Sequence, residues 1–306
     1  MRALKSSGFD EARSRDSLAS GSGYQFSHGG GVVARLLTRR LVWLYHRVMS
    51  LLTPARIYEE ELLDAGEGTD DDVARSLGDL RRINRFLGGR RVILNAISTC
   101  LDGASCEQIS MLDVGTGSAD IPIAVADQCR TRGLKTFVTA VDISERNLQV
   151  ARYRFGIDRE INFVRADSLN LPFAPRSFDF VTASLFLHHF RDEDVVRLLA
   201  DFGRIARRAV IVNDLIRNRV PYYFTRIAGP VLAKSFLTRN DAPVSVLRGF
   251  TSREMIELAT RAGLNNKEVK RSFPYRLSLV ADVRNQKSDV RRQKSEVGSQ
   301  KSTPDL

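Results

Sequence analysis

The stretch LDVGTGSADIP, from Leu112 to Pro122, decides the fold. Apolar residues precede Asp113, and two glycines, Gly115 and Gly117, follow it before a helical pattern begins. A strand, a glycine turn and a helix in this order form the ligand-binding corner of an open α/β sheet. The sequence therefore predicts a nucleotide-type site at the carboxyl end of this strand.

The loop differs from the glycine loops that hold phosphate. A dinucleotide fingerprint needs a third small residue where Asp120 stands, and the GK[ST] ending of a Walker A loop is absent. An acid at the helix N-terminus would also repel a pyrophosphate. S-adenosylmethionine, an adenosine ligand with a cationic amino group and no phosphate, suits this loop. Asp113 and Asp120 would face its ammonium group, and Gly115 and Gly117 would admit its methionyl part.

Strands and helices alternate beyond this stretch, which predicts a parallel sheet covered by helices. We expect an α/β fold with a doubly wound, mostly parallel, seven-stranded sheet. Two short strands, KEVKRSF and YRLSLVADV, joined at Pro274, would complete it. The other strands are expected at 109–114, 137–142, 161–165, 178–184 and 208–213, and helices at 119–132, 145–156, 192–206 and 251–262.

The loop and later segments resemble the class I S-adenosylmethionine-dependent methyltransferases over about residues 105–283. The acid-x-Gly-x-Gly-x-Gly motif of that family starts here at Asp113, with Ala119 in place of the third glycine. The resemblance implies a Rossmann-like fold, with S-adenosylmethionine as methyl donor, S-adenosylhomocysteine as product and no metal.

The same resemblance implies how the cofactor is held. Asp142, in VTAVDIS, would accept hydrogen bonds from both ribose hydroxyls, although an acid at this position is also a common turn or helix cap. Asp167 would accept from the adenine amine and Ala166 would donate its backbone amide to the ring. The full set of predicted cofactor contacts is Asp113, Gly115, Thr116, Gly117, Asp120, Asp142, Ile143, Ala166, Asp167, Ser168 and Ser184.

The acceptor site is expected at the ends of the fourth and fifth strands. His188 and His189 are candidate bases for a phenol, or merely packing and capping residues. Asn213 and Asp214 either contact the acceptor or cap the next helix. Ser184 opens the stretch Ser-Leu-Phe-Leu, which stands where nucleic-acid amino-methyltransferases carry Asn/Asp-Pro-Pro-aromatic, and this argues against nucleobase chemistry.

An aromatic and aliphatic insert, residues 215–250, fits a lid over an apolar ring, or a packing or dimer surface. Tyr223 would contact the ring, Arg217 or Arg226 would bind an acidic group, and Arg81 of a preceding helix, Asp70 to Gly89, would close the site. The expected acceptor is a small, largely apolar aromatic such as a phenol, polyketide or quinone precursor, with oxygen methylation favoured. The rivals are a membrane-associated quinone C-methyltransferase and a non-catalytic cofactor-binding protein.

The net charge of +11 lies mostly in the ends of the chain. Residues 1–48 hold 8 Lys and Arg against 3 Asp and Glu, residues 267–306 hold 10 against 5, and residues 49–266 hold 29 against 28. A near-neutral body lacks the basic footprint of a nucleic-acid binder, so no such partner is expected. Three cysteines without a CxxC pair favour a cytoplasmic location.

The domain organisation follows from composition. Residues 1–31 and 285–306 are polar and of low complexity, and we expect disordered tails. Residues 32–104 are expected to form a helical region that caps the catalytic domain, residues 105–284. Within the helical region, residues 32–52 fit a helix peripheral to the inner membrane surface, or one packed on the domain. The sequence leaves open the oligomeric state and whether residues 1–48 belong to the protein.

Overall fold

The computed structural model describes residues 53–102, 106–155 and 161–284. The expected tails and the predicted helix over 32–52 lie outside these residues.

The described strands form one seven-stranded sheet in the order β3-β2-β1-β4-β5-β7-β6. β1 to β5 run parallel, while β7 is antiparallel to both of its neighbours. This confirms the predicted fold class. The strands are β1 (Gln108–Val114), β2 (Lys135–Asp142), β3 (Ile161–Arg165), β4 (Phe178–Ser184), β5 (Ala206–Leu215), β6 (Lys267–Ser272) and β7 (Arg276–Asp282).

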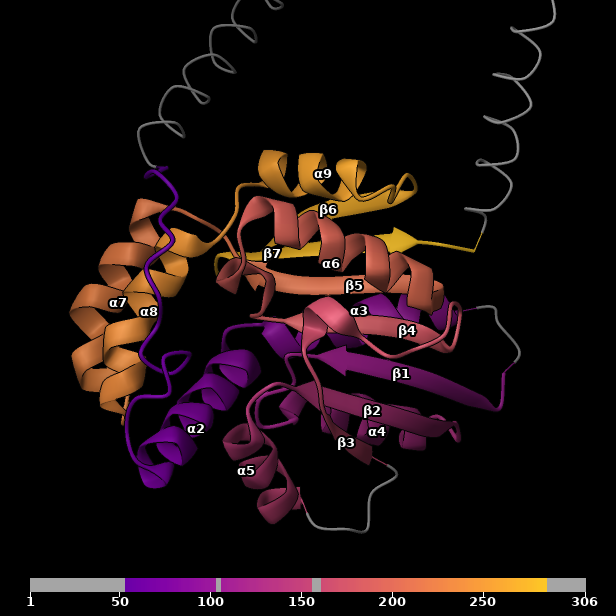
Figure 1. The fold of residues 1–306 in the computed structure, drawn as a ribbon, viewed down its shortest axis with the longest axis horizontal. Helices are drawn as coiled ribbons and strands as arrows, with labels where there is room; N and C mark the ends of the chain where they lie inside the picture. The colour runs from indigo at the N-terminus through magenta and orange to yellow at the C-terminus, as the bar shows by residue number, and fades with distance from the viewer. Residues whose placement is uncertain (1–52, 103–105, 156–160, 285–306) are drawn as a thin grey trace, which may run out of the picture. The chain divides into compact units, whose positions relative to one another are not determined.

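Helices cover both faces of the sheet (Figure 1). On one face, apolar residues of α6 (Asp192–Ile205) and α9 (Ser252–Arg261) pack against β4, β5 and β7. On the other face, α3 (Gly89–Leu101) and α4 (Asp120–Thr131) pack against β1, β2 and β5. α5 (Glu145–Phe155) packs beside β2 and β3. Burial on both faces explains why the central strands read as continuous apolar runs.

The order in which strands are added reverses between β1 and β4. β2 and β3 lie on one side of β1, and the chain then returns to place β4 on its other side. Open α/β sheets bind ligands outside the carboxyl ends of strands at such a point. Three helices gather at this end of the sheet in Figure 1: α2 (Asp70–Phe86), α7 (Arg219–Leu232) and α8 (Phe236–Arg248). The helices α7 and α8 are the predicted insert, and α2 is the predicted cap helix.

Local sequence signals begin and end these helices. Thr69 and Asp72 form a capping box at the start of α2, and Thr251 and Glu254 form another at the start of α9. Gly88, with φ +80°, separates α2 from α3. The stretch Asp70 to Gly89 predicts a helix stopped by its two glycines, and α2 ends at Phe86, just before them.

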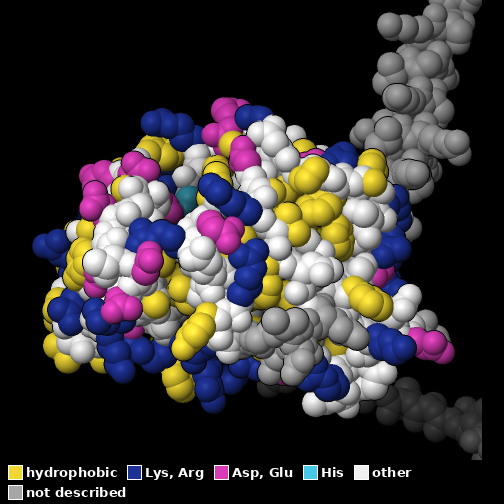
Figure 2. Space-filling model, turned by 60° about the horizontal axis from the view of Figure 1, so that its bottom comes forward, with side chains coloured by type: hydrophobic (Ala, Val, Ile, Leu, Met, Phe, Trp, Pro, Cys, Tyr) yellow, Lys and Arg dark blue, Asp and Glu magenta, His cyan; other side chains and the backbone are white. Residues whose placement is uncertain are grey.

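Among the described helices, none is both long and apolar enough to cross a bilayer. Figure 2 shows one face of the molecule, where Lys and Arg side chains are interspersed with acidic and hydrophobic ones. This mixture agrees with the near-neutral charge of the body of the chain.

Candidate active site

A cavity of about 1110 Å³ opens beyond the carboxyl ends of the parallel strands. Its walls come from the ends of β1, β2 and β4, from α2, α7 and α8, and from the turn between β6 and β7. The predicted residues that line it are Gly115, Gly117, Asp142, Ile143, Ala166, Asp167, Ser168, His188 and His189. The fold thus brings most of the predicted cofactor residues and both histidines to one cavity.

The glycine loop is fixed to the end of β2. The backbone N–H of Thr116 donates to the carbonyl of Val141 at 2.9 Å, and that of Gly117 donates to Oδ2 of Asp142 at 2.8 Å. Gly115 has φ +69°, and a Cβ there would overlap the ring of Phe186. Only glycine meets both requirements at this position.

Asp142 stands at the end of β2, where the sequence placed the ribose acid. Its Oδ1 accepts from the backbone N–H of Ser144 at 2.9 Å and from the amide of Asn147 at 3.2 Å. Burial raises the pKa of Asp142, although these donors oppose the shift. Each carboxylate oxygen can accept more than one hydrogen bond, so the group keeps capacity for a ligand.

A side chamber of about 60 Å³ adjoins the loop and is lined by Asp113, Asp120, Thr116, Ser184 and Asn84. Burial raises the pKa of Asp113 to about 7 and that of Asp120 to about 6. Oδ1 of Asn84 is buried and has no hydrogen-bond partner among the described residues. Two poorly solvated carboxyl groups and an unpaired oxygen suit a cationic donor, so the chamber fits the ammonium group of a methionyl moiety.

The predicted adenine contacts need one correction. The backbone N–H of Ala166 donates to the carbonyl of Asp142 at 3.2 Å, so it is already engaged within the protein. Asp167 caps a short 3-10 turn, with Oδ1 accepting from the N–H of Leu169 at 2.9 Å. Its carboxylate still borders the cavity, as does Ser168.

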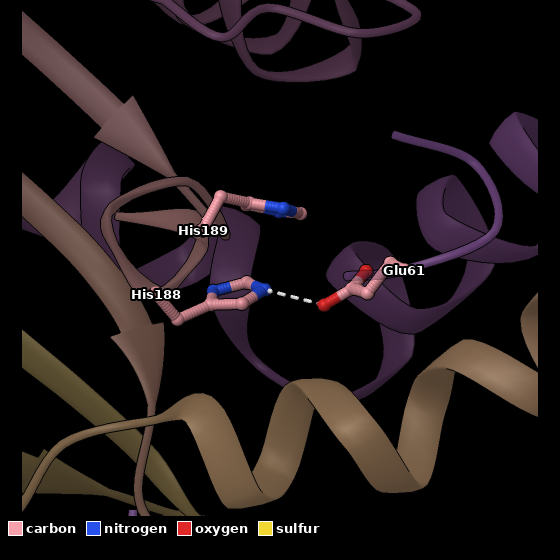
Figure 3. A group of neighbouring side chains, drawn as sticks. All are labelled: Glu61, His188 and His189. Atoms are coloured by element: carbon pink, nitrogen blue, oxygen red, sulfur yellow. Dashed lines mark ion pairs between the residues drawn. The ribbon is translucent and has the colours of Figure 1, made fainter. Parts of the chain in front are cut away.

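His188 is a buried member of an ion-pair network. Its Nδ1 lies 2.7 Å from Oδ1 of Asp214, and its Nε2 lies 3.5 Å from Oε1 of Glu61 (Figure 3). Burial alone would lower the pKa of His188, but the two carboxylates outweigh it and raise the pKa to about 9. Burial likewise acts to raise the pKa of Glu61, but His189 and His188 lower it to about 2. His188 therefore carries a proton between two carboxylates at neutral pH.

His189 has different surroundings. Its Nδ1 lies 2.5 Å from Oδ2 of Asp64, and about a fifth of its side chain is exposed, at 21%. In the tautomer in which Nδ1 donates to Asp64, Nε2 is the nitrogen that can accept a proton. The two imidazole rings lie side by side, with centroids 4.2 Å apart (Figure 3). His189 is thus the histidine suited to remove a proton from a ligand in the cavity.

Glu61, His188 and His189 could also offer ligands to a metal ion, because their ligand atoms lie within 4.8 Å of one another. Protonated His188 already pairs with the carboxylates of Glu61 and Asp214, which explains why these side chains lie together without a metal ion. We therefore interpret the cluster as an ion-pair network.

Arg248 holds both histidines in place through their backbone. Its guanidinium is buried and donates to the carbonyls of His188, His189 and Glu59 at 3.1, 2.6 and 2.8 Å. The segment that carries Glu61 and Asp64 is thereby tied to the histidine turn.

The remaining predicted acceptor residues do not line the main cavity among the described residues. Asn213 donates to Oγ of Ser184 at 2.8 Å, and Asp214 pairs with His188. Arg217 is buried against Glu254 and two backbone carbonyls, so it is not available to an acidic ligand. Tyr223 is 57% exposed on the outside of α7, and Arg81 does not reach the cavity wall.

Sequence reasoning missed Glu61, Asp64 and Arg276, all of which line the cavity. Glu61 and Asp64 lie in the acidic run EEELLDAGE, which has no motif spacing. Arg276 begins a strand near the end of the chain. Only the tertiary fold reveals that these residues line the same cavity as the glycine loop.

Residues 111–209 match a family model described as a methyltransferase domain. The sheet order, the glycine loop and this match together identify a class I methyltransferase domain in the chain. S-adenosylmethionine is the methyl donor of this class, which agrees with the cofactor expected from the loop.

Two curated relatives are similar to this core. A demethylmenaquinone methyltransferase of Porphyromonas gingivalis is 34% identical over 98 residues, which is 29% of this chain and 39% of the relative. A 27-O-demethylrifamycin SV methyltransferase of Amycolatopsis mediterranei is 32% identical over 104 residues, 31% of this chain and 36% of the relative. The chain thus matches less than half the length of either relative.

The fold is also similar to a solved structure of human N-acetylserotonin methyltransferase in complex with S-adenosylmethionine. The TM-score is 0.52 at 14% identity, over 74% of this chain and 62% of that one. At this identity the similarity concerns the fold alone.

Proposed function

We propose that the chain transfers a methyl group from S-adenosylmethionine to a hydroxyl oxygen of a small, largely apolar aromatic acceptor. A phenol, a polyketide or a quinone precursor fits this description. The observation that carries the proposal is one cavity of about 1110 Å³ that joins the cofactor residues to His189 and an apolar compartment. Single-ligand pockets span roughly 300–1,000 Å³, so this volume leaves room for a cofactor and an acceptor.

The apolar compartment supports a ring-containing acceptor. Its walls include Leu77 and Phe86 of α2, Phe224 and Leu232 of α7, and Phe273. Phe86 and Phe273 are 72% and 92% exposed, so they also form a rim open to solvent. Large aromatic side chains left exposed beside a cavity favour a lipophilic ligand that buries them.

Methyl transfer from a sulfonium depends mainly on alignment of the acceptor with the methyl group. S-adenosylmethionine supplies an electrophilic methyl group when bound. In our proposal Asp142 orients the ribose, and Asp113 and Asp120 hold the ammonium group. His189 accepts the proton of the acceptor hydroxyl at Nε2, while Asp64 stabilises the imidazolium through Nδ1. A phenol has a pKa of ~10, so a positioned base accelerates its reaction near neutral pH.

The names of the relatives support two versions of this chemistry. One relative is named for a demethylmenaquinone and the other for an O-demethylated rifamycin. Carbon methylation of a hydroquinone ring would use the same removal of a hydroxyl proton, so a quinone C-methyltransferase is the second candidate. The geometry of His189 favours a hydroxyl acceptor in both cases.

The test incubates the full chain and methyl-labelled S-adenosylmethionine with extract of the source organism, followed by separation into solvent-soluble, RNA and protein fractions. Label in a solvent-soluble aromatic product supports the proposal, and the position of the label distinguishes oxygen from carbon methylation. Label in RNA or protein contradicts it. Cofactor binding without any transfer would favour a non-catalytic cofactor-binding protein.

A further inference from the structure

Arg276, the first residue of β7, is almost completely buried, with 1% of its surface exposed. Its Nε–H donates to the carbonyl of Leu87 at 3.2 Å. Nη1 and Nη2 have no hydrogen-bond partner within the described part of the chain. Arg276 is one of the residues that line the main cavity, and both Nη atoms are buried there without a partner. A buried guanidinium with unpaired donors has lost its hydration without compensation. A ligand that accepts hydrogen bonds from it would offset this cost.

Other arginines of the cavity wall are neutralised by the protein. Arg82 pairs with Asp79, and Arg146 pairs with Asp70 at 2.8 Å. Arg276 forms no ion pair with any carboxylate of the described residues. Burial lowers the pKa of Arg276 to about 10, against the opposing effect of Asp214 and Asp120. The group still carries its charge at neutral pH, so among the described residues of the cavity wall Arg276 is a buried cation without an ion-pair partner.

We propose that Arg276 binds an anionic oxygen of the acceptor, a carboxylate or an ionised hydroxyl on its aromatic ring. This inference rests on the proposed function and names the charge of the substrate. The planar guanidinium offers two free NH2 groups, Nη1 and Nη2, in a fixed fork, which matches a carboxylate in a bidentate arrangement. The apolar walls from Phe86, Phe224 and Phe273 would hold the ring, and Arg276 would fix its orientation.

The cofactor also carries a carboxylate, in its methionyl group, so the same chemistry has a second source. The predicted methionyl site is the side chamber lined by Asp113 and Asp120. Arg276 lines the main cavity and does not line that chamber. The acceptor is therefore the favoured partner of Arg276.

The test measures binding of two probes to the full chain with S-adenosylhomocysteine in excess, by equilibrium dialysis. 1-Hydroxy-2-naphthoate carries a carboxylate, and 1-naphthol has the same ring without it. We expect the wild-type protein to bind the naphthoate at least about tenfold more tightly, which corresponds to one charge-assisted pair. Arg276→Met should remove this preference, and the same substitution at the exposed Arg253 of α9, Arg253→Met, should retain it.

Several results would overturn the inference. The inference is wrong if the wild-type protein does not distinguish the two probes, or if Arg276→Met retains the preference for the naphthoate. A loss of S-adenosylhomocysteine affinity in Arg276→Met, with the probe preference unchanged, would assign Arg276 to the cofactor carboxylate. The variant is expected to fold, because an apolar side chain of similar length replaces a buried unpaired charge. Arg276→Gln is the second variant, with the same expected loss.

Probe binding requires no methyl transfer. A failed transfer assay and a missing charge preference are therefore separate results, which test the proposed function and this inference independently.

Discussion

At the scale of single residues, His188 and His189 are neighbours in sequence with different surroundings, and we propose different roles for them. His188 is held between Asp214 and Glu61, whereas His189 pairs with Asp64 through Nδ1 and lines the cavity. We predict that His189→Gln lowers kcat for a phenolic acceptor by about 10²–10⁴, the usual contribution of a general base. KM and the affinity for S-adenosylhomocysteine should change little. Steady-state kinetics and calorimetry measure these quantities.

The matched substitution His188→Gln should act mainly on stability. It leaves Asp214 and Glu61 buried without their cationic partner, which costs about 3–5 kcal/mol of unfolding free energy. Urea unfolding measures this loss. An equal fall in kcat for both variants without a difference in stability would contradict the division of roles.

The raised pKa of His188 also predicts how stability depends on pH. A histidine whose pKa is about 9 in the folded state, against 6.5 when unperturbed, binds its proton more tightly in the folded protein. Its contribution is fully present below pH 6.5 and is lost as the pH rises through about 9. The unfolding free energy of the wild-type protein should therefore fall between pH 7 and 9 more steeply than that of His188→Gln. Parallel curves for the two proteins would contradict the assignment.

At the scale of the elements, α2 begins with a capping box and contributes to the wall of the cavity. Its capping box joins Thr69 to Asp72, and its later turns supply Leu77 and Phe86 to the cavity. Thr69→Ala should destabilise the protein by about 1 kcal/mol, because it leaves a helix N–H unpaired. Asp71→Ala, in the same exposed first turn, retains the box and serves as the control. Urea unfolding of both variants tests this, and equal stabilities would show that the box contributes nothing.

The elements of the catalytic core could be predicted from sequence because each has a local cause. Burial on both faces gives continuous apolar strands, and caps or glycines mark the helix ends. Composition alone predicts either a lid or a packing or dimer surface for the insert over 215–250, and its division into α7 and α8 has no comparable signal. Both helices contain an internal proline, Pro230 and Pro243, which by itself argues against a helix. Tertiary packing overrides this local preference.

At the scale of the whole molecule, the charge of the chain and the composition of its site have different origins. The basic excess lies in the terminal residues, whereas the body is nearly neutral. The cofactor loop could be predicted because its residues are contiguous. Glu61, Asp64 and Arg276 could not, because they come to the same cavity from distant parts of the chain and have no characteristic spacing. Arg217 illustrates the same limit, since the fold pairs it with Glu254, away from the cavity.

The central claim is that the cavity beyond β1 and β2 binds S-adenosylmethionine, with Asp142 on the ribose. Calorimetric titration of S-adenosylhomocysteine into the wild-type protein and Asp142→Asn tests it most directly. We predict one site per chain in the wild-type protein and a loss of roughly 10- to 150-fold in the variant, from about 1.5–3 kcal/mol for hydrogen bonds to a charged group. Thermal unfolding should confirm that the variant is folded, and Asp201→Asn, on α6, is the control that should bind normally. An absence of binding to the wild-type protein, or equal affinities for the wild-type protein and folded Asp142→Asn, would contradict the account.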